Sequence, residues 1–208
     1  MQPEASAKSS TRLARRAWRL IAIVGAGLLA SQLALPAQAG GPRCFGRAAT
    51  IVGDAGDNRL TGGDGVDVIV GAGGNDILDG AGGNDFVCGK AGGDTLVGSA
   101  GDDWLNGATG RDFITGVKGD DVLFGHGGPD VLNFGDEENG SDRVFGGRGN
   151  DSLSAGLGAD RLFGQAGDDT LTEGEVDAPI VDLFSGGVGS DTCAPGTEDV
   201  VNGCELPL

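Results

Sequence analysis

The stretch GAGGNDILDGAGGNDFVCG, Gly71–Gly89, contains nearly the same nine-residue phrase twice. The phrase recurs along the chain in fourteen units. Nine of them follow one another from Gly53 without a slip, four resume at Glu137, and the last begins at Gly186. A repeat of this regularity has to be interpreted before any other feature, because it determines the fold.

Three positions of the unit hardly vary. Position four is Gly in all fourteen copies, and position six is Asp in every copy except the first, which has Asn58. Position eight is Leu, Ile or Val in every copy except the last, which has Cys193. The unit therefore reads G-G-x-G-x-D-x-U-x, where U is aliphatic, and this is the pattern of a calcium-binding nonapeptide repeat.

The residue types of the unit suit calcium. The glycines permit positive φ and close approach of the backbone, so the first six residues make a tight turn with carbonyl groups facing a shared groove. The Asp adds a charged oxygen, and Ca²⁺ prefers six to eight oxygen ligands. The expected metal ligands are the position-six carboxylates Asp67, Asp76, Asp85, Asp94, Asp103, Asp112, Asp121, Asp130, Asp142, Asp151, Asp160 and Asp169, with Gly74, Gly83, Gly92, Gly101, Gly110 and Gly119 at position four.

The remaining x-U-x is expected to form a three-residue strand with the aliphatic side chain facing inward. One unit then makes half a coil, so each unit stacks on the second unit after it, and Asp76 lies over Asp94. A divalent cation between stacked carboxylates turns their repulsion into attraction. The sequence thus predicts an all-β protein, a parallel β-roll (β-solenoid) of about fourteen repeats that binds about seven to ten Ca²⁺ ions, with a weaker site at Asn58.

On these repeats the sequence resembles the repeats-in-toxin family, also called hemolysin-type calcium-binding repeats. It is most similar to short secreted bacterial members that consist mainly of repeats. The resemblance implies a parallel β-roll loaded with Ca²⁺. A disordered Gly-rich acidic tail is the rival interpretation, but strict nine-residue phasing of aliphatic residues has no purpose in a disordered chain.

The net charge of −17 argues against nucleic acid and anionic lipid as partners. Without calcium this charge is uncompensated, so we expect the calcium-free chain to be mostly unfolded. No enzyme is visible in the sequence. His126 is the only histidine, which excludes an H-E-x-x-H site, and no G-x-S-x-G motif occurs.

Residues 1–39 have the layout of a secretory signal peptide. Basic residues between Lys8 and Arg19 precede an apolar run, Leu20 to Leu35, which is followed by Ala37-Gln38-Ala39. The apolar run is short for a membrane span. We therefore expect a secreted, extracellular protein with no membrane span after cleavage.

Four cysteines remain after the leader, an even number that suggests two disulfides in an exported chain. Four cysteines allow three connectivities. We expect Cys44–Cys88, because Cys88 lies outside the core at position nine of its unit, and a local Cys193–Cys204 bond.

Position seven faces outward and is apolar in alternate units. The expected stripe on one sheet comprises Val68, Phe86, Trp104 and Val122, with Phe124 beside them, and a less complete one on the other sheet comprises Ile77, Phe113 and Val131. Arg143 and Arg161 follow on the first sheet if the phase is kept. Exposed apolar patches often mark partner sites, although strands favour such residues anyway.

The predicted organisation is a signal peptide (1–39), an N-terminal cap (40–52), uninterrupted repeats (53–133), repeats after a short insertion (134–172), and a region with a loop, the last repeat and a disulfide-linked cap (173–208). Two functions remain open. One is a secreted protein that folds by binding calcium. The other is a calcium-dependent adhesion or surface-assembly protein that binds an unidentified envelope partner, or itself, through the stripe.

Overall fold

The computed structural model describes residues 41–133, 140–173, 181–196 and 199–205. All secondary-structure elements in these residues are β-strands, and no helix in them is long and apolar enough to cross a membrane. The predicted signal peptide, residues 1–39, lies outside the described residues. So does the three-residue insertion at 134–136.

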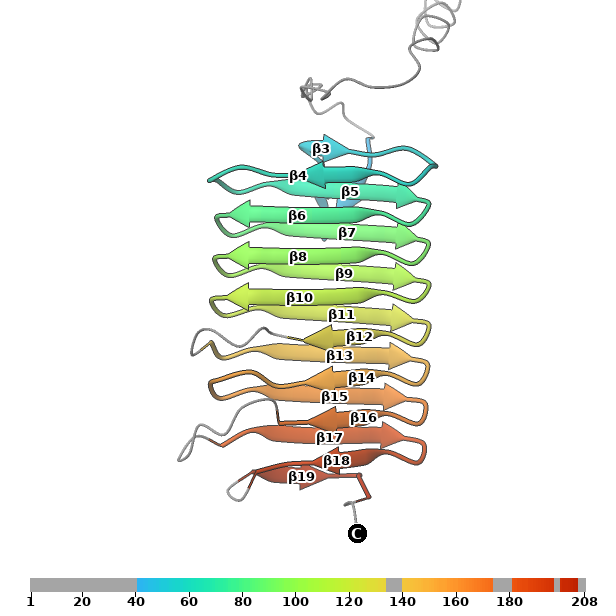
Figure 1. The fold of residues 1–208 in the computed structure, drawn as a ribbon, viewed down its shortest axis with the longest axis vertical. Helices are drawn as coiled ribbons and strands as arrows, with labels where there is room; N and C mark the ends of the chain where they lie inside the picture. Colours follow the sequence, from blue (N-terminus) through green and yellow to red (C-terminus); the bar gives the residue numbers. More distant parts are fainter. Residues whose placement is uncertain (1–40, 134–139, 174–180, 197–198, 206–208) are drawn as a thin grey trace, which may run out of the picture. The chain divides into compact units, whose positions relative to one another are not determined.

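Two parallel sheets face each other, and the chain alternates between them (Figure 1). The nine-stranded sheet contains β3 (Ile51–Val52), β5 (Val68–Gly73), β7 (Phe86–Ala91), β9 (Trp104–Thr109), β11 (Val122–Gly127), β13 (Arg143–Arg148), β15 (Arg161–Ala166), β17 (Leu183–Val188) and β19 (Val200–Asn202). The eight-stranded sheet contains β4 (Arg59–Thr61), β6 (Ile77–Gly82), β8 (Thr95–Ala100), β10 (Phe113–Lys118), β12 (Val131–Asn133), β14 (Ser152–Ser154), β16 (Thr170–Thr172) and β18 (Thr192–Ala194).

This is the predicted β-roll, in which each unit stacks on the second unit after it. Leu96 pairs with Ile114 and Leu105 with Leu123, and each partner lies two units further along the chain. The core is the file of position-eight side chains between the sheets. Its fully buried members include Leu78, Leu96, Leu105, Ile114, Leu123, Leu132, Leu153, Leu162 and Leu171. We call each strand of the roll a rung. Most rungs contribute one aliphatic side chain to the core, so each repeat supplies one core residue.

The insertion after β12 leaves the ladder intact. Val122 of β11 pairs with Arg143 of β13, and Arg143 pairs with Arg161 of β15, so the phase of the nine-stranded sheet is kept. The roll also has more rungs than the fourteen predicted repeats. β3, β17 and β19 are additional, and β17 places Phe184 in the core. Their segments lack the G-G-x-G half of the unit, which is why the repeat pattern did not identify them.

The prediction of three-residue strands was wrong for most rungs. Ten strands are six residues long, β5 to β11 and β13, β15 and β17, because pairing continues through positions one to three of the next unit. In β9 and β11, for example, Ala108 still pairs with His126 and Thr109 with Gly127. Strands of three residues occur in the eight-stranded sheet at β4, β12, β14, β16 and β18 and at β19 of the other sheet.

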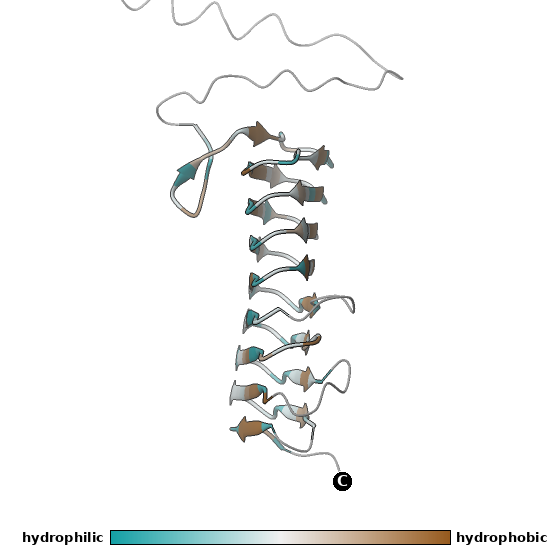
Figure 2. Ribbon diagram, turned by 90° about the vertical axis from the view of Figure 1, so that its left-hand side faces the viewer, coloured by the Kyte–Doolittle hydropathy of each residue, from teal (hydrophilic) through white to brown (hydrophobic). Residues whose placement is uncertain are grey.

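A short antiparallel hairpin, β1 (Arg43–Cys44) and β2 (Arg47–Ala48), precedes the roll. It lies outside the stack, beside one row of strands (Figure 2). Ile51 of β3 pairs with Ile69 and packs against the core, whereas Cys44 and Phe45 belong to a second cluster on the outer face of the nine-stranded sheet. The segment expected to cap the first rung therefore has two parts. Ile51 packs against the end of the core, and the hairpin covers the outer face of the nine-stranded sheet.

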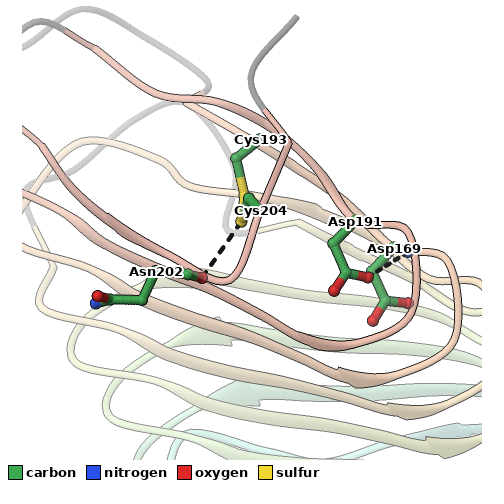
Figure 3. Close-up of a disulfide and its surroundings, with 5 residues drawn as sticks. All are labelled: Asp169, Asp191, Cys193, Asn202 and Cys204. Carbon is green, nitrogen blue, oxygen red and sulfur yellow. Dashed lines mark hydrogen bonds between the residues drawn. A yellow bond between two sulfur atoms is a disulfide. The ribbon is translucent and has the colours of Figure 1, made fainter.

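The C-terminal segment folds back on β18. The N–H of Cys193 donates to the carbonyl of Glu205 at 3.1 Å, and the N–H of Glu205 donates to the carbonyl of Asp191. A disulfide joins Cys193 to Cys204 at the same end (Figure 3). The second disulfide joins Cys44 to Cys88. These are the two pairings that the sequence favours.

Candidate functional site

The position-six side chains form two columns, one along each edge of the roll. Thirteen of the aspartates are 4% exposed or less. The Asp76 column lies where the chain enters the eight-stranded sheet and comprises Asn58, Asp76, Asp94, Asp112, Asp130, Asp151, Asp169 and Asp191. The Asp85 column lies where the chain enters the nine-stranded sheet and comprises Asp67, Asp85, Asp103, Asp121, Asp142, Asp160, Asp182 and Asp199.

A ladder of hydrogen bonds runs through each column. The Oδ1 of each Asp accepts the backbone N–H of the position-six residue one rung earlier, as Asp112 does from Asp94 at 2.8 Å. The ladder crosses both insertions of the Asp85 column, from Asp121 to Asp142 at 2.6 Å and from Asp160 to Asp182 at 2.8 Å. Hydrogen bonds to a carboxylate are worth about 1.5–3 kcal/mol each, so this ladder holds neighbouring rungs in register.

The repeat pattern missed Asp182 and Asp199. Asp182 accepts from Asp160, and its own N–H donates to Asp199 at 2.9 Å. Neither residue follows a G-x-D motif. The signal that could have found them is the second half of the unit alone, Asp-Leu-Phe-Ser at 182–185 and Asp-Val-Val-Asn at 199–202.

Ten turns share one backbone conformation, with positive φ at positions two and four. We call these open turns, and the first three residues of each are the last three residues of a six-residue strand. At position four glycine is required: Gly92 has φ of +133°, and a Cβ there would lie 1.8 Å from the carbonyl oxygen of Gly74. Position two tolerates other residues, including Val117 with φ of 94°. The position-four carbonyls therefore point along the column at the next rung.

In nine of the ten open turns the second carboxylate oxygen, Oδ2, has no protein hydrogen-bond partner among the described residues. Within the described residues, nine Oδ2 atoms of these turns are buried without any hydrogen bond: those of Asp76, Asp85, Asp94, Asp103, Asp112, Asp130, Asp151, Asp169 and Asp191. The glycine at position one of the turn leaves space beside this Oδ2 atom. A Cβ at Gly71 would lie 2.2 Å from Asp76 Oδ2 and 3.0 Å from the carbonyl oxygen of Gly89 on the next rung. A carboxylate oxygen and a carbonyl oxygen thus border the same space.

Other turns close on their own carboxylate or amide. The N–H at position two donates to the position-six side chain in these closed turns, from Gly63 to Asp67 Oδ2 at 2.8 Å and from Gly156 to Asp160 Oδ2 at 3.2 Å. Asn58 likewise accepts the N–H of Asp54 at 2.8 Å. The predicted ligands Asp67 and Asp160 therefore differ from those of the open turns, because the backbone already occupies their Oδ2.

Burial makes the charged form of these carboxylates unfavourable. It raises the pKa of Asp112 to about 6, of Asp103 to about 7 and of Asp121 to about 8, from an ordinary value of 3.8. The backbone hydrogen bond from the preceding rung opposes this effect, and neighbouring carboxylates add to it. A cation beside Oδ2 would restore the charged form at neutral pH.

The fit to calcium is good on this donor set. The free groups are hard oxygens, a carboxylate from one turn and carbonyls from stacked turns, which is the chemistry that Ca²⁺ prefers. Among the described residues, no three side chains of His, Cys, Asp or Glu form a metal site. A cation bound in these turns would take its remaining ligands from the backbone.

The predicted apolar stripe lies on the outer face of the nine-stranded sheet and is partly covered by the N-terminal hairpin. Val68 and Val122 are 6% and 4% exposed. The ring of Phe45 contacts Phe86 and Trp104, with centroids 6.2 and 5.4 Å apart. The hairpin before the repeats therefore covers part of the stripe, while Trp104 is still 39% exposed, and binding of a partner through the stripe stays a prediction. On the other sheet Ile77 and Phe113 are exposed, at 41% and 46%.

Comparison with known families agrees with this geometry. The model of the RTX calcium-binding nonapeptide repeat, four copies long, matches residues 46–78, 61–96, 89–118, 97–132 and 138–171, more than half of the chain. A comparison with curated proteins finds no match. The repeats, the stacked turns and this match together show that the chain belongs to the family of RTX calcium-binding nonapeptide repeat proteins.

Proposed function

We propose that this calcium-binding β-roll protein is secreted and folds by binding several Ca²⁺ ions between its stacked turns. The observation that carries the proposal is the file of buried Oδ2 atoms in the open turns that have no hydrogen-bond partner among the described residues. A buried carboxylate oxygen without a partner is costly, and many of them in one small protein require a compensating charge.

The open turns are the proposed calcium sites. Asp76, Asp94, Asp112, Asp130, Asp151, Asp169 and Asp191 would hold the ions of the Asp76 column, and Asp85, Asp103 and Asp121 those of the Asp85 column. Carbonyls of the stacked turns, including those of Gly74, Gly83, Gly92, Gly101, Gly110 and Gly119, would complete the ligand sets. The bound ion supplies positive charge. The chain supplies the turn that keeps Oδ2 free and the Oδ1 ladder that fixes its position.

Calcium titration of the purified chain tests the proposal. Far-UV circular dichroism should show a largely unfolded chain in chelator and a β-rich one in millimolar Ca²⁺, and calorimetry should show uptake of several ions. Affinities of about 10⁻⁴ to 10⁻³ M are typical of extracellular calcium modules. Mg²⁺ is the matched control, since it dehydrates reluctantly and prefers a strict octahedral site. Identical spectra in chelator and calcium, with no heat of binding, would refute the proposal.

Secretion is the second part of the proposal. It is supported by the layout of residues 1–39 and by the two disulfides, which are typical of oxidising compartments. Mass spectrometry of the exported chain tests it: the N-terminus should be Gly40. A chain recovered only inside the cell, with residues 1–39 intact, would contradict this part and leave calcium binding untouched.

A further inference from the structure

The N-terminal hairpin contacts the roll across several rungs. Phe45, at its tip, lies against Phe86 of β7, Trp104 of β9 and Phe124 of β11, with ring centroids 6.2, 5.4 and 5.8 Å away. Cys44 is fully buried and is bonded to Cys88, which is 1% exposed. In a solenoid each rung otherwise contacts only its neighbours. The hairpin is therefore a brace that spans three successive strands, of which the first and the last, β7 and β11, do not pair with each other.

The conformation of the hairpin tip supports a specific role for Phe45. Phe45 and Gly46 have φ of 47° and 79°, as in a two-residue turn with both central residues left-handed. Asn, Asp and Gly are the usual residues there, and a bulky side chain at positive φ is unfavourable. Strain of this kind persists only where the surroundings fix it. Here the aromatic contacts fix it, together with the hydrogen bond from Arg43 Nη1 to the Gly46 carbonyl at 2.7 Å.

The disulfide and the ring contacts of Phe45 involve no residue of the open turns, although Ala72 of the Gly71–Asp76 turn packs against the same cluster. The brace consists of the disulfide, the aromatic rings, and the guanidinium of Arg47 at 4.0 Å from the centroid of Phe86. The buried residues of this cluster, Val68 and Val70 among them, lie on the outer face of the nine-stranded sheet, separate from the core file. Removing calcium leaves all of these interactions chemically intact.

We propose that the hairpin is a covalent clamp that holds β5 to β11 of the nine-stranded sheet together when calcium is absent. The calcium-free chain then keeps an ordered segment around Trp104, on which calcium completes the roll. The Cys44–Cys88 bond lowers the calcium concentration that folding requires. The proposal deepens the proposed function, because it concerns the calcium-free state of a chain that folds with calcium.

Trp104 is a built-in reporter of the clamp. The chain has two tryptophans, Trp18 and Trp104, so a Trp18→Phe background leaves one signal. In chelator, quenching of Trp104 by acrylamide should be about twofold weaker in this background than in the same chain unfolded in urea, as expected for a locally ordered segment. Replacing both Cys44 and Cys88 with Ser should remove this protection. The same replacement should raise the calcium midpoint of folding about two- to threefold, because the unfolded chain gains freedom.

Two further variants separate the clamp from a general disulfide effect. Phe45→Gly keeps the disulfide and suits the backbone at this position, so a loss of Trp104 protection in chelator would identify the ring as the contact. Replacing Cys193 and Cys204 with Ser removes the other disulfide and should leave Trp104 in chelator unchanged.

The proposal is overturned if Trp104 in chelator is as accessible as in urea, or if the Cys193/Cys204 variant exposes Trp104 as much as the Cys44/Cys88 variant does. Quenching in chelator involves no calcium, so this outcome is distinct from failure of the proposed function, which the calcium titration of the unaltered chain reports.

Discussion

The two turn columns use the same residue at position six and differ in what the turn leaves free. In the Asp76 column every Asp from Asp76 to Asp191 belongs to an open turn and has a buried Oδ2 without a partner among the described residues. In the Asp85 column this holds for Asp85 and Asp103, whereas Asp67, Asp160 and Asp199 have Oδ2 bonded to a backbone N–H. Both insertions also enter the Asp85 column.

This difference between the columns shows that the two oxygens of each position-six carboxylate have separate roles. Oδ1 holds the rungs in register in both columns, whatever the turn sequence. Oδ2 is available to a cation only where the turn is open. An Asp at position six is therefore sufficient for the ladder, and the turn conformation determines whether it is also a metal ligand.

The largest expected effect is a change of three aspartates to Asn within one column. Asn keeps an Oδ1 acceptor for the ladder and loses the charge. Replacing Asp94, Asp112 and Asp130 should raise the calcium midpoint of folding at least about tenfold, since three adjacent sites lose their only charged ligand. The matched triple of Asp67, Asp160 and Asp199 should keep the same number of bound ions by calorimetry.

Equal loss of ions from the two triples would show that open and closed turns bind calcium alike. The distinction between the columns would then be wrong, although calcium binding itself would stand.

A smaller effect is expected from adding one methyl group to a turn. At Gly110, φ is +141° and a Cβ would lie 1.7 Å from the carbonyl oxygen of Gly92, whereas a Cβ at Gly65 of a closed turn meets nothing within 4 Å. Gly110→Ala should lower the free energy of unfolding in calcium by roughly 2–4 kcal/mol. Gly65→Ala should change it by less than about 0.5 kcal/mol. Urea denaturation in saturating calcium measures both, and similar losses would mean that the two turn types share a conformation.

The smallest expected effect is a pH dependence that reverses with calcium. Burial raises the pKa of Asp112, Asp130 and Asp121 to about 6, 7 and 8 in the folded chain, so the calcium-free fold binds more protons than the unfolded chain. Its stability is therefore lost as pH rises through these values, and in chelator the residual β-signal should grow as pH falls from about 8 to about 5. In the presence of calcium, protons compete with the ion for the same carboxylates. The calcium midpoint of folding should therefore rise as pH falls from about 8 to about 5.

A calcium-free chain whose dichroism does not change between these pH values would argue against buried carboxylates in that state. The calcium-loaded chain, measured at the same two pH values, is the control.

The repeat pattern was enough to predict the roll, its register and the inward file of aliphatic residues, because each of these follows from a period of nine. It could not separate open from closed turns. Gly62 to Asp67 reads as a complete G-G-x-G-x-D and is closed, while Gly71 to Asp76 is open. The neighbours in the column differ: the closed turn at Asp67 has no repeat turn before it, and the closed turn at Asp160 has none after it. The sequence of a single unit does not contain this context.

The hairpin and the last rungs were missed for a related reason. Phe45 lies outside the repeats, and its contacts with Trp104 and Phe124 join segments that no period connects. β17 and β19 keep only the strand half of the unit, and they join the sheet through pairs such as Leu162 with Phe184 and Phe184 with Val201. Backbone pairing in a growing sheet thus recruits sequences that the repeat consensus excludes.

The return of the chain over β18 has a consequence for how molecules of this kind behave in concentrated solution. A parallel stack of near-identical rungs is a template on which strands of another chain could keep adding, as in fibrils. Glu205 takes the bonding positions of Cys193 and Asp191 at the end of the eight-stranded sheet. The segment at Glu205 therefore occupies part of the outer edge of β18, and this hinders the addition of a strand from another molecule to this sheet.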